Sequence, residues 1–238
     1  SRIQAVHEAA PPHDPQVDLV DFGDKLISPA FVNGHTHVAL GVMRGMNVEL
    51  ATQGNMVEDL FFGFESQLTA DDIRAFARMG AYEGLLQGVG LVWEHYYEGL
   101  AVAEAMRDVG VSAVIAPTLQ DLSGPGAKRW EAQLAITTEL HGDGRFHEAG
   151  IFAALGPHAT DTVSAELWKR VAEVSRSEGL PVHAHVAQSV EEYGRAWERE
   201  GCSPVEWLDR LGILDLESGS VFAHLLYASG ADLDRLHR

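Results

Sequence analysis

Short apolar runs alternate along the chain with longer segments whose apolar residues recur at helical spacing. The apolar runs are predicted to be strands, at residues 30–38, 91–97, 111–119, 151–156, 181–186 and 220–227. The longer segments are predicted to be helices, at residues 70–87, 100–109, 128–140, 164–178, 190–211 and 230–237. Thr69 is a suitable N-cap for the first helix, and Gly110 and Gly179 are suitable C-terminal residues for two others. The helical segment 190–211 is interrupted near residues 201–204.

Six strand–helix units in succession predict an α/β fold with a parallel sheet. The candidate architectures are an open doubly wound sheet and a closed eight-stranded barrel. No GxGxxG or GxxxxGK[ST] motif follows a strand, which disfavours the nucleotide-binding doubly wound folds. We therefore predict a (β/α)8 TIM-type barrel of the metal-dependent hydrolase kind. A complete barrel takes about 250 residues. We accordingly expect residues 29–238 to be a barrel truncated to about six units and incomplete at its C-terminus, and residues 1–28 to be the remnant of a small β-sandwich domain.

Composition limits the classes of partner. Apolar residues make up 46% of the chain and charged residues 22%, which is typical of soluble globular proteins. The formal net charge of −18 argues against binding nucleic acid or an anionic membrane, and no apolar run approaches the roughly 20 residues that cross a bilayer. The single cysteine, Cys202, excludes an intrachain disulfide and fits a reducing cytoplasm. A cytoplasmic protein with a small-molecule partner is expected, and a homo-oligomer is left open.

Histidines gather at the ends of the predicted strands, where ligands bind in parallel α/β folds. Side chains two residues apart on a strand point to the same side, so His35 and His37 share one face, as do His183 and His185. The strand at 151–156 leads into His158, and the strand at 220–227 contains His224. A lone histidine is more often a hydrogen-bonded core residue than a ligand. Two such pairs at strand ends, with a further histidine on the next strand, instead indicate a divalent metal site of the kind that suits Zn, Fe or Ni.

Several motifs resemble those of a known family. The first-strand segment resembles the signature of the amidohydrolase superfamily, and the other motifs follow in that family's order. The chain is similar to the branch containing S-adenosylhomocysteine and methylthioadenosine deaminases, guanine-type deaminases and triazine (chloro)hydrolases. The motifs are Leu26 to His37, Met43-Arg44-Gly45, Gly156-Pro157-His158-Ala159, His183-Ala184-His185 and Val221-Phe222-Ala223-His224.

The resemblance implies a role for each of several residues. His35, His37 and His185 would hold one divalent metal ion, Zn with Fe as the alternative. His224 would orient or polarise the attacking water. The family's remaining ligand, an aspartate after the eighth strand, is expected to lie outside this chain, so residues 1–238 alone are not expected to catalyse.

The resemblance also gives three substrate-binding positions, Glu65, Arg129 and His158. For Glu65, a solvated carboxylate beside a helix is the alternative reading. For Arg129, the alternative is a surface charge on a helix.

Gln188 departs from the family pattern. Deaminases of this branch carry His-x-x-Glu after the fifth strand, whereas this chain has His185-Val186-Ala187-Gln188. Glutamine exchanges hydrogen bonds but supplies no proton near pH 7, and the loss of a general acid costs roughly 10²- to 10⁴-fold in rate. Glu191 and Glu192 follow one turn later, and helical geometry is expected to point them elsewhere. Gln188 is thus a site residue whose role the sequence leaves open.

The sequence therefore predicts a hydrolase in which metal-activated water deaminates an aminated heterocycle or nucleoside-like substrate, such as a purine, a pterin or an adenosine derivative. His158 and His224 could stabilise the tetrahedral intermediate. Phe61, Phe62 and the pair Tyr96 and Tyr97 could frame a planar ring, whereas Trp93 is expected to be ordinary core packing. Two alternatives stay open: a triazine-type enzyme that hydrolyses amide or C–Cl bonds, and a weakly active or inactive binding homologue.

Overall fold

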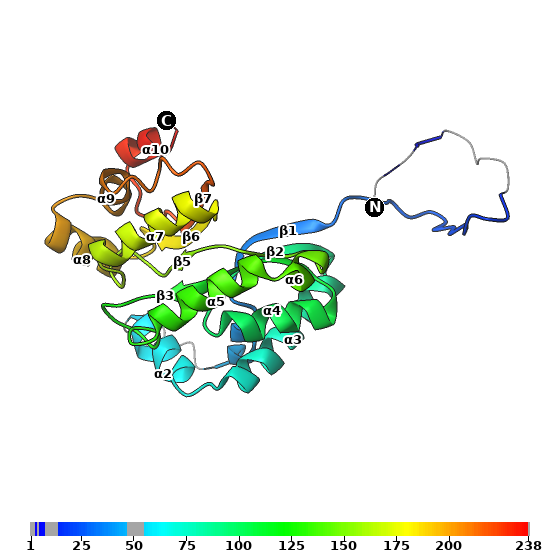
Figure 1. The fold of residues 1–238 in the computed structure, drawn as a ribbon, viewed down its shortest axis with the longest axis horizontal. Coiled ribbons are helices and arrows are strands. Elements are labelled where there is room, and N and C mark those ends of the chain that lie inside the picture. Colours follow the sequence, from blue (N-terminus) through cyan, green and yellow to red (C-terminus); the bar gives the residue numbers. More distant parts are fainter. Residues whose placement is uncertain (1–2, 4, 8–13, 47–54, 238) are drawn as a thin grey trace.

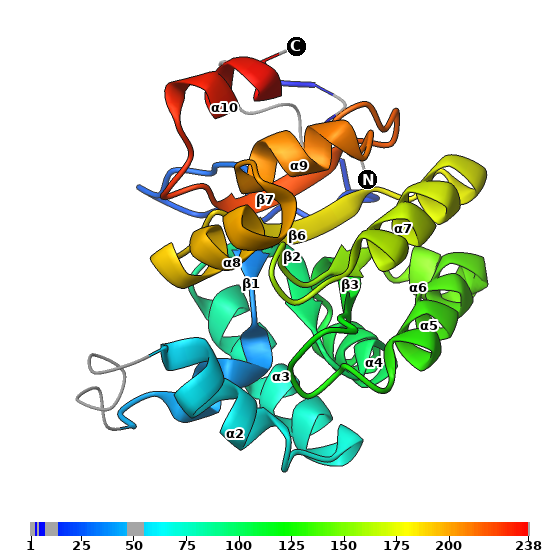
Figure 2. The same cartoon turned by 90° about the vertical axis from the view of Figure 1, so that its left-hand side faces the viewer.

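Parallel strands follow one another in sequence order around an open arc (Figures 1 and 2), in a computed structural model that describes residues 3, 5–7, 14–46 and 55–237. The first sheet runs β1 (Phe31–Thr36), β2 (Val89–Tyr96), β3 (Ser112–Leu119) and β4 (Ile151–Ala153), with β5 (Gly156–Pro157) also paired to β3. The second sheet pairs β6 (Val182–Val186) with β7 (Ser220–His224). Single parallel bridges, Leu155 to Val182 and Ala159 to His185, connect the two sheets. Among the described residues, β7 does not pair with β1.

Helices surround the strands on the outside of the arc, as Figure 2 shows. The helices that follow the strands are α3 (Ala70–Leu86), α4 (Gly99–Val109), α5 (Trp130–Gly142), α6 (Gly144–Glu148), α7 (Ala165–Glu178), α8 (Val190–Glu200), α9 (Pro204–Arg210) and α10 (Gly230–Leu236). Shorter turns follow β1, namely the 3₁₀ helix η1 (Val38–Met43), the π-helix η2 (Val57–Phe61) and α2 (Phe62–Glu65). In the described part of the chain, no helix combines the length and the apolar character needed to cross a membrane.

Local sequence explains the helix boundaries. Thr69 caps α3 through a hydrogen bond from the Asp72 N–H, and the Asp72 carboxylate accepts from Thr69 in return. Gly110 and Gly179 end α4 and α7 in the left-handed conformation, at φ of 84° and 69°. Ser203 caps α9 next to Pro204, which explains the interruption predicted near residues 201–204. These predicted boundaries are confirmed to within a residue or two.

The hydrophobic core fills the space between strands and helices. Ile115 of β3, Met106 of α4 and Leu155 between the sheets are at most 1% exposed. Trp168 of α7 is 0% exposed and packs edge-on against Trp207 of α9. This apolar layer fixes the positions of the strand ends, on which the site depends.

Two predicted strands end differently in the structure. The strand predicted at 151–156 divides into β4 and β5, because Leu155 leaves the β3 ladder and bridges to Val182. β7 stops at His224 rather than at residue 227, because His224 and Leu225 take positive φ values of 79° and 53° that end the extended chain. The described residues before 29 contain neither strand nor helix, and they extend away from the sheets (Figure 1). The β-sandwich assigned to residues 1–28 stays a prediction.

Candidate metal centre and substrate cavity

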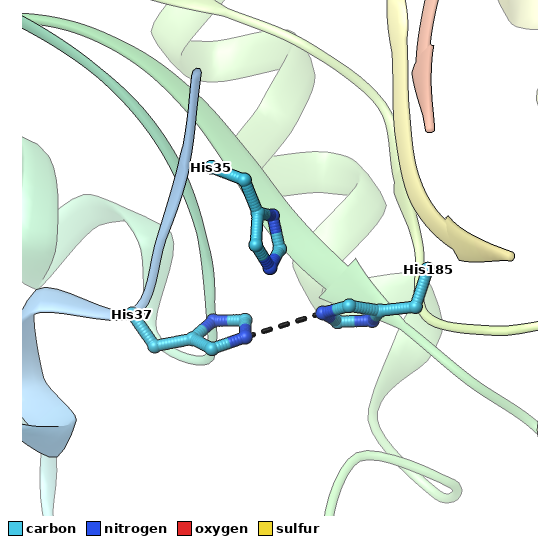
Figure 3. Close-up of side chains that lie close together, drawn as sticks. All are labelled: His35, His37 and His185. Carbon is cyan, nitrogen blue, oxygen red and sulfur yellow. Dashed lines mark hydrogen bonds between the residues drawn. The ribbon is translucent and has the colours of Figure 1, made fainter. Parts of the chain in front are cut away.

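Three imidazoles from two separate strands meet at the carboxyl ends of the strands (Figure 3). His35 lies on β1, His37 directly follows it, and His185 lies on β6. One ring nitrogen from each lies within 4.8 Å of the others, and the Nε2 atoms of His37 and His185 are 3.1 Å apart. The structure thus brings together the three residues that the sequence assigned to a metal.

Backbone carbonyls set the tautomers of two of these rings. His37 Nδ1 donates a hydrogen bond to the carbonyl of His95, and His185 Nδ1 donates to the carbonyl of His158 at 2.7 Å. Because a carbonyl oxygen only accepts, both Nδ1 atoms carry the proton and both Nε2 atoms present lone pairs. Two lone pairs 3.1 Å apart repel each other unless a cation lies between them. The arrangement therefore fits a divalent ion held by imidazole nitrogens, with further positions open.

Burial keeps these imidazoles neutral. It lowers the pKa of His35 to about 3, assisted by the neighbouring histidines, and it lowers the pKa of His37 to about 4. The pKa of His185 is well below its usual range for the same reason. Neutral imidazole is the form that binds a metal ion, so the three rings are ready to bind near pH 7.

A cavity of about 340 Å³ opens above the three rings. The predicted site residues Glu65, His158, Gln188 and His224 all line it. Aromatic and apolar side chains form much of the remaining wall: Phe61, Phe62, Tyr96, Tyr97, Leu40, Met56 and Val57. A volume of this order suits a small heterocycle.

Two side chains considered in the sequence analysis, Trp93 and Arg129, do not line the cavity. Trp93 contacts the His183 ring at 5.7 Å between centroids instead of lining the cavity, in agreement with the predicted packing role. Arg129 precedes α5, is about half exposed, and pairs with Glu98 at 2.6 Å. Arg129 is therefore not among the residues that line the cavity, and its substrate-binding role stays a prediction.

The rings of His158 and His224 both contact the ring of His185. The ring centroids of His158 and His185 are 4.9 Å apart, and those of His224 and His185 are 5.4 Å apart and stacked. His158 Nδ1 is 2.8 Å from the Thr162 hydroxyl. Burial lowers the pKa of His158 to about 3. Burial also lowers the pKa of His224, so both rings are neutral near pH 7.

Glu65 is the only carboxyl group among the residues described as lining the cavity. Burial raises its pKa to about 7, and the nearby Tyr96 hydroxyl lowers that pKa in part. The Tyr96 hydroxyl is buried, and it makes no hydrogen bond of normal geometry within the described residues. Glu65 and Tyr96 are thus polar groups on the cavity wall that a ligand could satisfy.

Sequence analysis gave no role to three further residues. His95 lines the cavity and is 1% exposed, and its Nδ1 is 3.2 Å from the Thr118 hydroxyl. Glu94 and Glu192 are buried carboxyl groups that contact backbone N–H groups next to His37 and soon after His185. As expected, Glu192 does not line the cavity. The only sequence pattern that involves Glu192 is Ser189-x-x-Glu192, which is typical of the start of a helix.

Comparison with known proteins defines the class. The sequence profile of the Amidohydrolase family matches residues 26–238. The chain therefore belongs to the amidohydrolase family, and the resemblance noted from its motifs is confirmed.

Its relatives include deaminases. The chain is 32% identical over 198 residues to a 5-methylthioadenosine/S-adenosylhomocysteine deaminase of Moorella thermoacetica, covering 83% of this chain and 45% of the relative. It is 31% identical over 222 residues to a 5'-deoxyadenosine deaminase of Methanopyrus kandleri, covering 93% of this chain and 50% of the relative. The chain thus spans about half the length of the curated relatives it matches.

Solved structures support the fold. An adenosine deaminase from Xanthomonas campestris with bound zinc matches with a TM-score of 0.76 at 22% identity, over 87% of this chain and 46% of the other. The atrazine chlorohydrolase from Arthrobacter aurescens complexed with zinc matches with a TM-score of 0.70 at 20% identity, over 87% of this chain and 51% of the other. The family and these neighbours define an α/β fold of the TIM-barrel type, which agrees with the parallel strands and surrounding helices.

Proposed function

We propose that the protein containing this chain is a metal-dependent aminohydrolase that deaminates an aminated heterocycle or nucleoside-like substrate. The observation that carries the proposal is the group of three neutral imidazoles at the base of an aromatic-walled cavity. The deaminase names of the relatives at 31–32% identity support it.

His35, His37 and His185 would hold one divalent ion, with zinc preferred and iron as the alternative. Such an ion lowers the pKa of a bound water from about 15.7 toward about 7, which supplies hydroxide near neutral pH. In the overall reaction, water and the aminated ring give the corresponding carbonyl compound and ammonia.

The cavity residues would bind and orient the substrate. His158 and His224 would donate hydrogen bonds to the negative charge that develops on the oxygen or nitrogen atoms attached to the reacting carbon. Glu65 would bind a polar group of the substrate, and Tyr96 and Tyr97 would frame its ring. Arg129 would take part only if the substrate displaced its partner Glu98.

Gln188 favours a second candidate reaction. It lines the cavity, but it cannot transfer a proton to a leaving amine. Chloride leaves a ring carbon without needing a proton, so a C–Cl hydrolase of the triazine type is the alternative. A protein that binds its ligand without turnover is the third outcome.

A substrate panel with the full-length protein separates these outcomes. The zinc-loaded protein would be incubated with 5'-methylthioadenosine, S-adenosylhomocysteine, 5'-deoxyadenosine, adenosine and guanine, and with a chlorotriazine. Ammonia and chloride would be measured, with a His185→Ala variant as the control. Ammonia release that His185→Ala abolishes supports the proposal. Chloride release without ammonia release supports the second candidate, and ligand binding without either product supports the third.

Other assignments also stay predictions. These are the domain boundary at residue 28, the cytoplasmic location and the formation of a homo-oligomer. The preference for small-molecule over nucleic-acid or membrane partners rests on the net charge of −18.

A further inference from the structure

Two buried carboxyl groups lie outside the cavity, yet each contacts the backbone just after a metal-binding strand. They are Glu94 of β2, which is 0% exposed, and Glu192 of α8, which is 1% exposed. Neither forms a salt bridge in the part of the chain that the structure describes. Burying a carboxyl group without a cationic partner is expensive, and an apolar residue of similar size would often serve stability as well. Their placement therefore requires an explanation other than packing.

Glu94 holds the chain directly after His37. The backbone N–H of Val38 donates to both carboxylate oxygens, at 3.1 and 3.0 Å. Val38 is the first residue of η1, so Glu94 occupies the role that an N-cap side chain would fill. The next residue of β2, His95, accepts from His37 Nδ1 through its carbonyl. Two consecutive residues of β2 thus fix both the backbone and the ring of one ligand.

Glu192 holds the chain directly after His185. Its oxygens accept from the backbone N–H groups of Ala187, at 3.1 Å, and of Gln188, at 2.6 Å. Ala187 has a φ of 52°, a left-handed conformation that is unfavourable for alanine because its Cβ approaches the following carbonyl oxygen. The same carboxyl group accepts from the Thr160 hydroxyl, two residues after His158, whose carbonyl fixes the His185 ring. Glu192 therefore stabilises the strained turn and ties it to the loop that orients the ligand.

We propose that Glu94 and Glu192 are positioning residues that hold His37 and His185 in the metal-binding arrangement before the ion arrives. Such residues are needed because the two Nε2 lone pairs lie 3.1 Å apart, and their repulsion would separate the rings if the backbone did not hold them in place before metal binding. This inference rests on the metal centre of the proposed function, but not on the identity of the substrate.

The test is the affinity of the full-length protein for Zn²⁺, measured by competition with a chromophoric chelator. Glu192→Gln keeps the size of the side chain but places an NH₂ group against at least one of the three donors, so we expect a 10- to 100-fold loss of affinity. Glu94→Leu removes both carboxylate oxygens that accept from the Val38 N–H, and we expect a loss of the same order. Glu94→Gln keeps one acceptor oxygen for that single donor, so it should restore affinity to within about threefold of wild type.

Asp232→Asn is the matched control. Asp232 is also the third residue of a helix and 2% exposed, and it accepts from the Ser229 N–H at 2.8 Å and from the Ser203 hydroxyl. None of these partners adjoins a metal-binding histidine. This variant should lose thermal stability but keep its zinc affinity.

Wild-type affinity in Glu192→Gln would overturn the inference, and so would an equal loss in Asp232→Asn. If Glu94→Leu does not fold, Glu192→Gln decides alone, because it conserves volume and polarity. The visible spectrum of the Co²⁺-loaded protein gives a second measure, since displaced ligands change the coordination geometry. A wild-type protein that binds no zinc would refute the proposed metal centre itself. This outcome differs from zinc binding that the two glutamate substitutions leave unchanged, which would refute only the positioning role.

Discussion

A metal ion at the three-histidine site would join two strands that share no backbone hydrogen bonds. In the described part of the chain, β1 pairs with β2 and β6 pairs with β7, yet the Nε2 atoms of His37 and His185 are 3.1 Å apart. A metal ion that binds the folded state but not the unfolded state stabilises the folded state by RT ln(1 + [L]/Kd). We therefore predict that chelation lowers the melting temperature and that a single histidine substitution removes this effect.

The size of the effect can be calculated. When free zinc is held at 100 times its measured Kd, the stabilisation is about 2.7 kcal/mol. For a chain in the size range of 238 residues, each kcal/mol moves the melting temperature by about 2–4 °C. The expected difference between zinc-loaded and chelated protein is thus about 5–11 °C.

Scanning calorimetry at pH 7 measures this difference directly. His185→Ala should melt at the same temperature with and without zinc. His147→Ala is the control, because His147 is exposed, stacks on Phe152 and lies outside the cluster, so it should keep the full difference. A His185→Ala protein that kept the wild-type difference would refute the shared-ion reasoning.

Three more predictions follow from single residues. Burial raises the Glu65 pKa from 4.5 to about 7, so protonated Glu65 contributes stability that is fully present below pH 4.5 and is lost as the pH rises through 7. Melting temperatures measured from pH 4 to 8 should show this loss in the wild type but not in Glu65→Gln. Parallel pH profiles for the two proteins would contradict the prediction. Trp168→Ala, at a fully buried position, should lower the free energy of unfolding by about 3–5 kcal/mol in denaturant titrations, whereas Trp197→Ala, at a 53% exposed position, should change it by less than about 1 kcal/mol. Gln188→Glu should raise the rate of ammonia release by about 10²-fold or more, because it restores a proton donor to the cavity; an unchanged rate would show that another group already supplies the proton.

Much of the architecture was predictable because local signals and tertiary contacts agree. Thr69, Gly110 and Gly179 have the chemistry of helix ends, and they occupy helix ends. The two-residue period of a strand was enough to place His35 and His37 on one face. Parallel strands then bring His185 to the same rim, although 148 residues separate it from His37.

Other features depend on contacts that no local pattern encodes. The π-helix η2 and the neighbouring α2 bring Phe61 and Glu65 to the cavity wall, and their sequence gave no distinct helical signal. The sequence around Arg129 looks the same whether its side chain binds a substrate or pairs with Glu98, and only the folded structure shows the pair with Glu98. Glu94 appears in the sequence as one polar residue in an apolar strand, and its bond to Val38 spans 56 residues.

The non-glycine residues that the structure places at positive φ all lie at or just after the carboxyl ends of strands. They are Glu98 after β2, Ala187 after β6, and His224 and Leu225 at the end of β7. Glycine or asparagine would adopt these conformations more easily. Laboratory evolution for heat resistance alone should therefore accumulate such replacements at these strand ends.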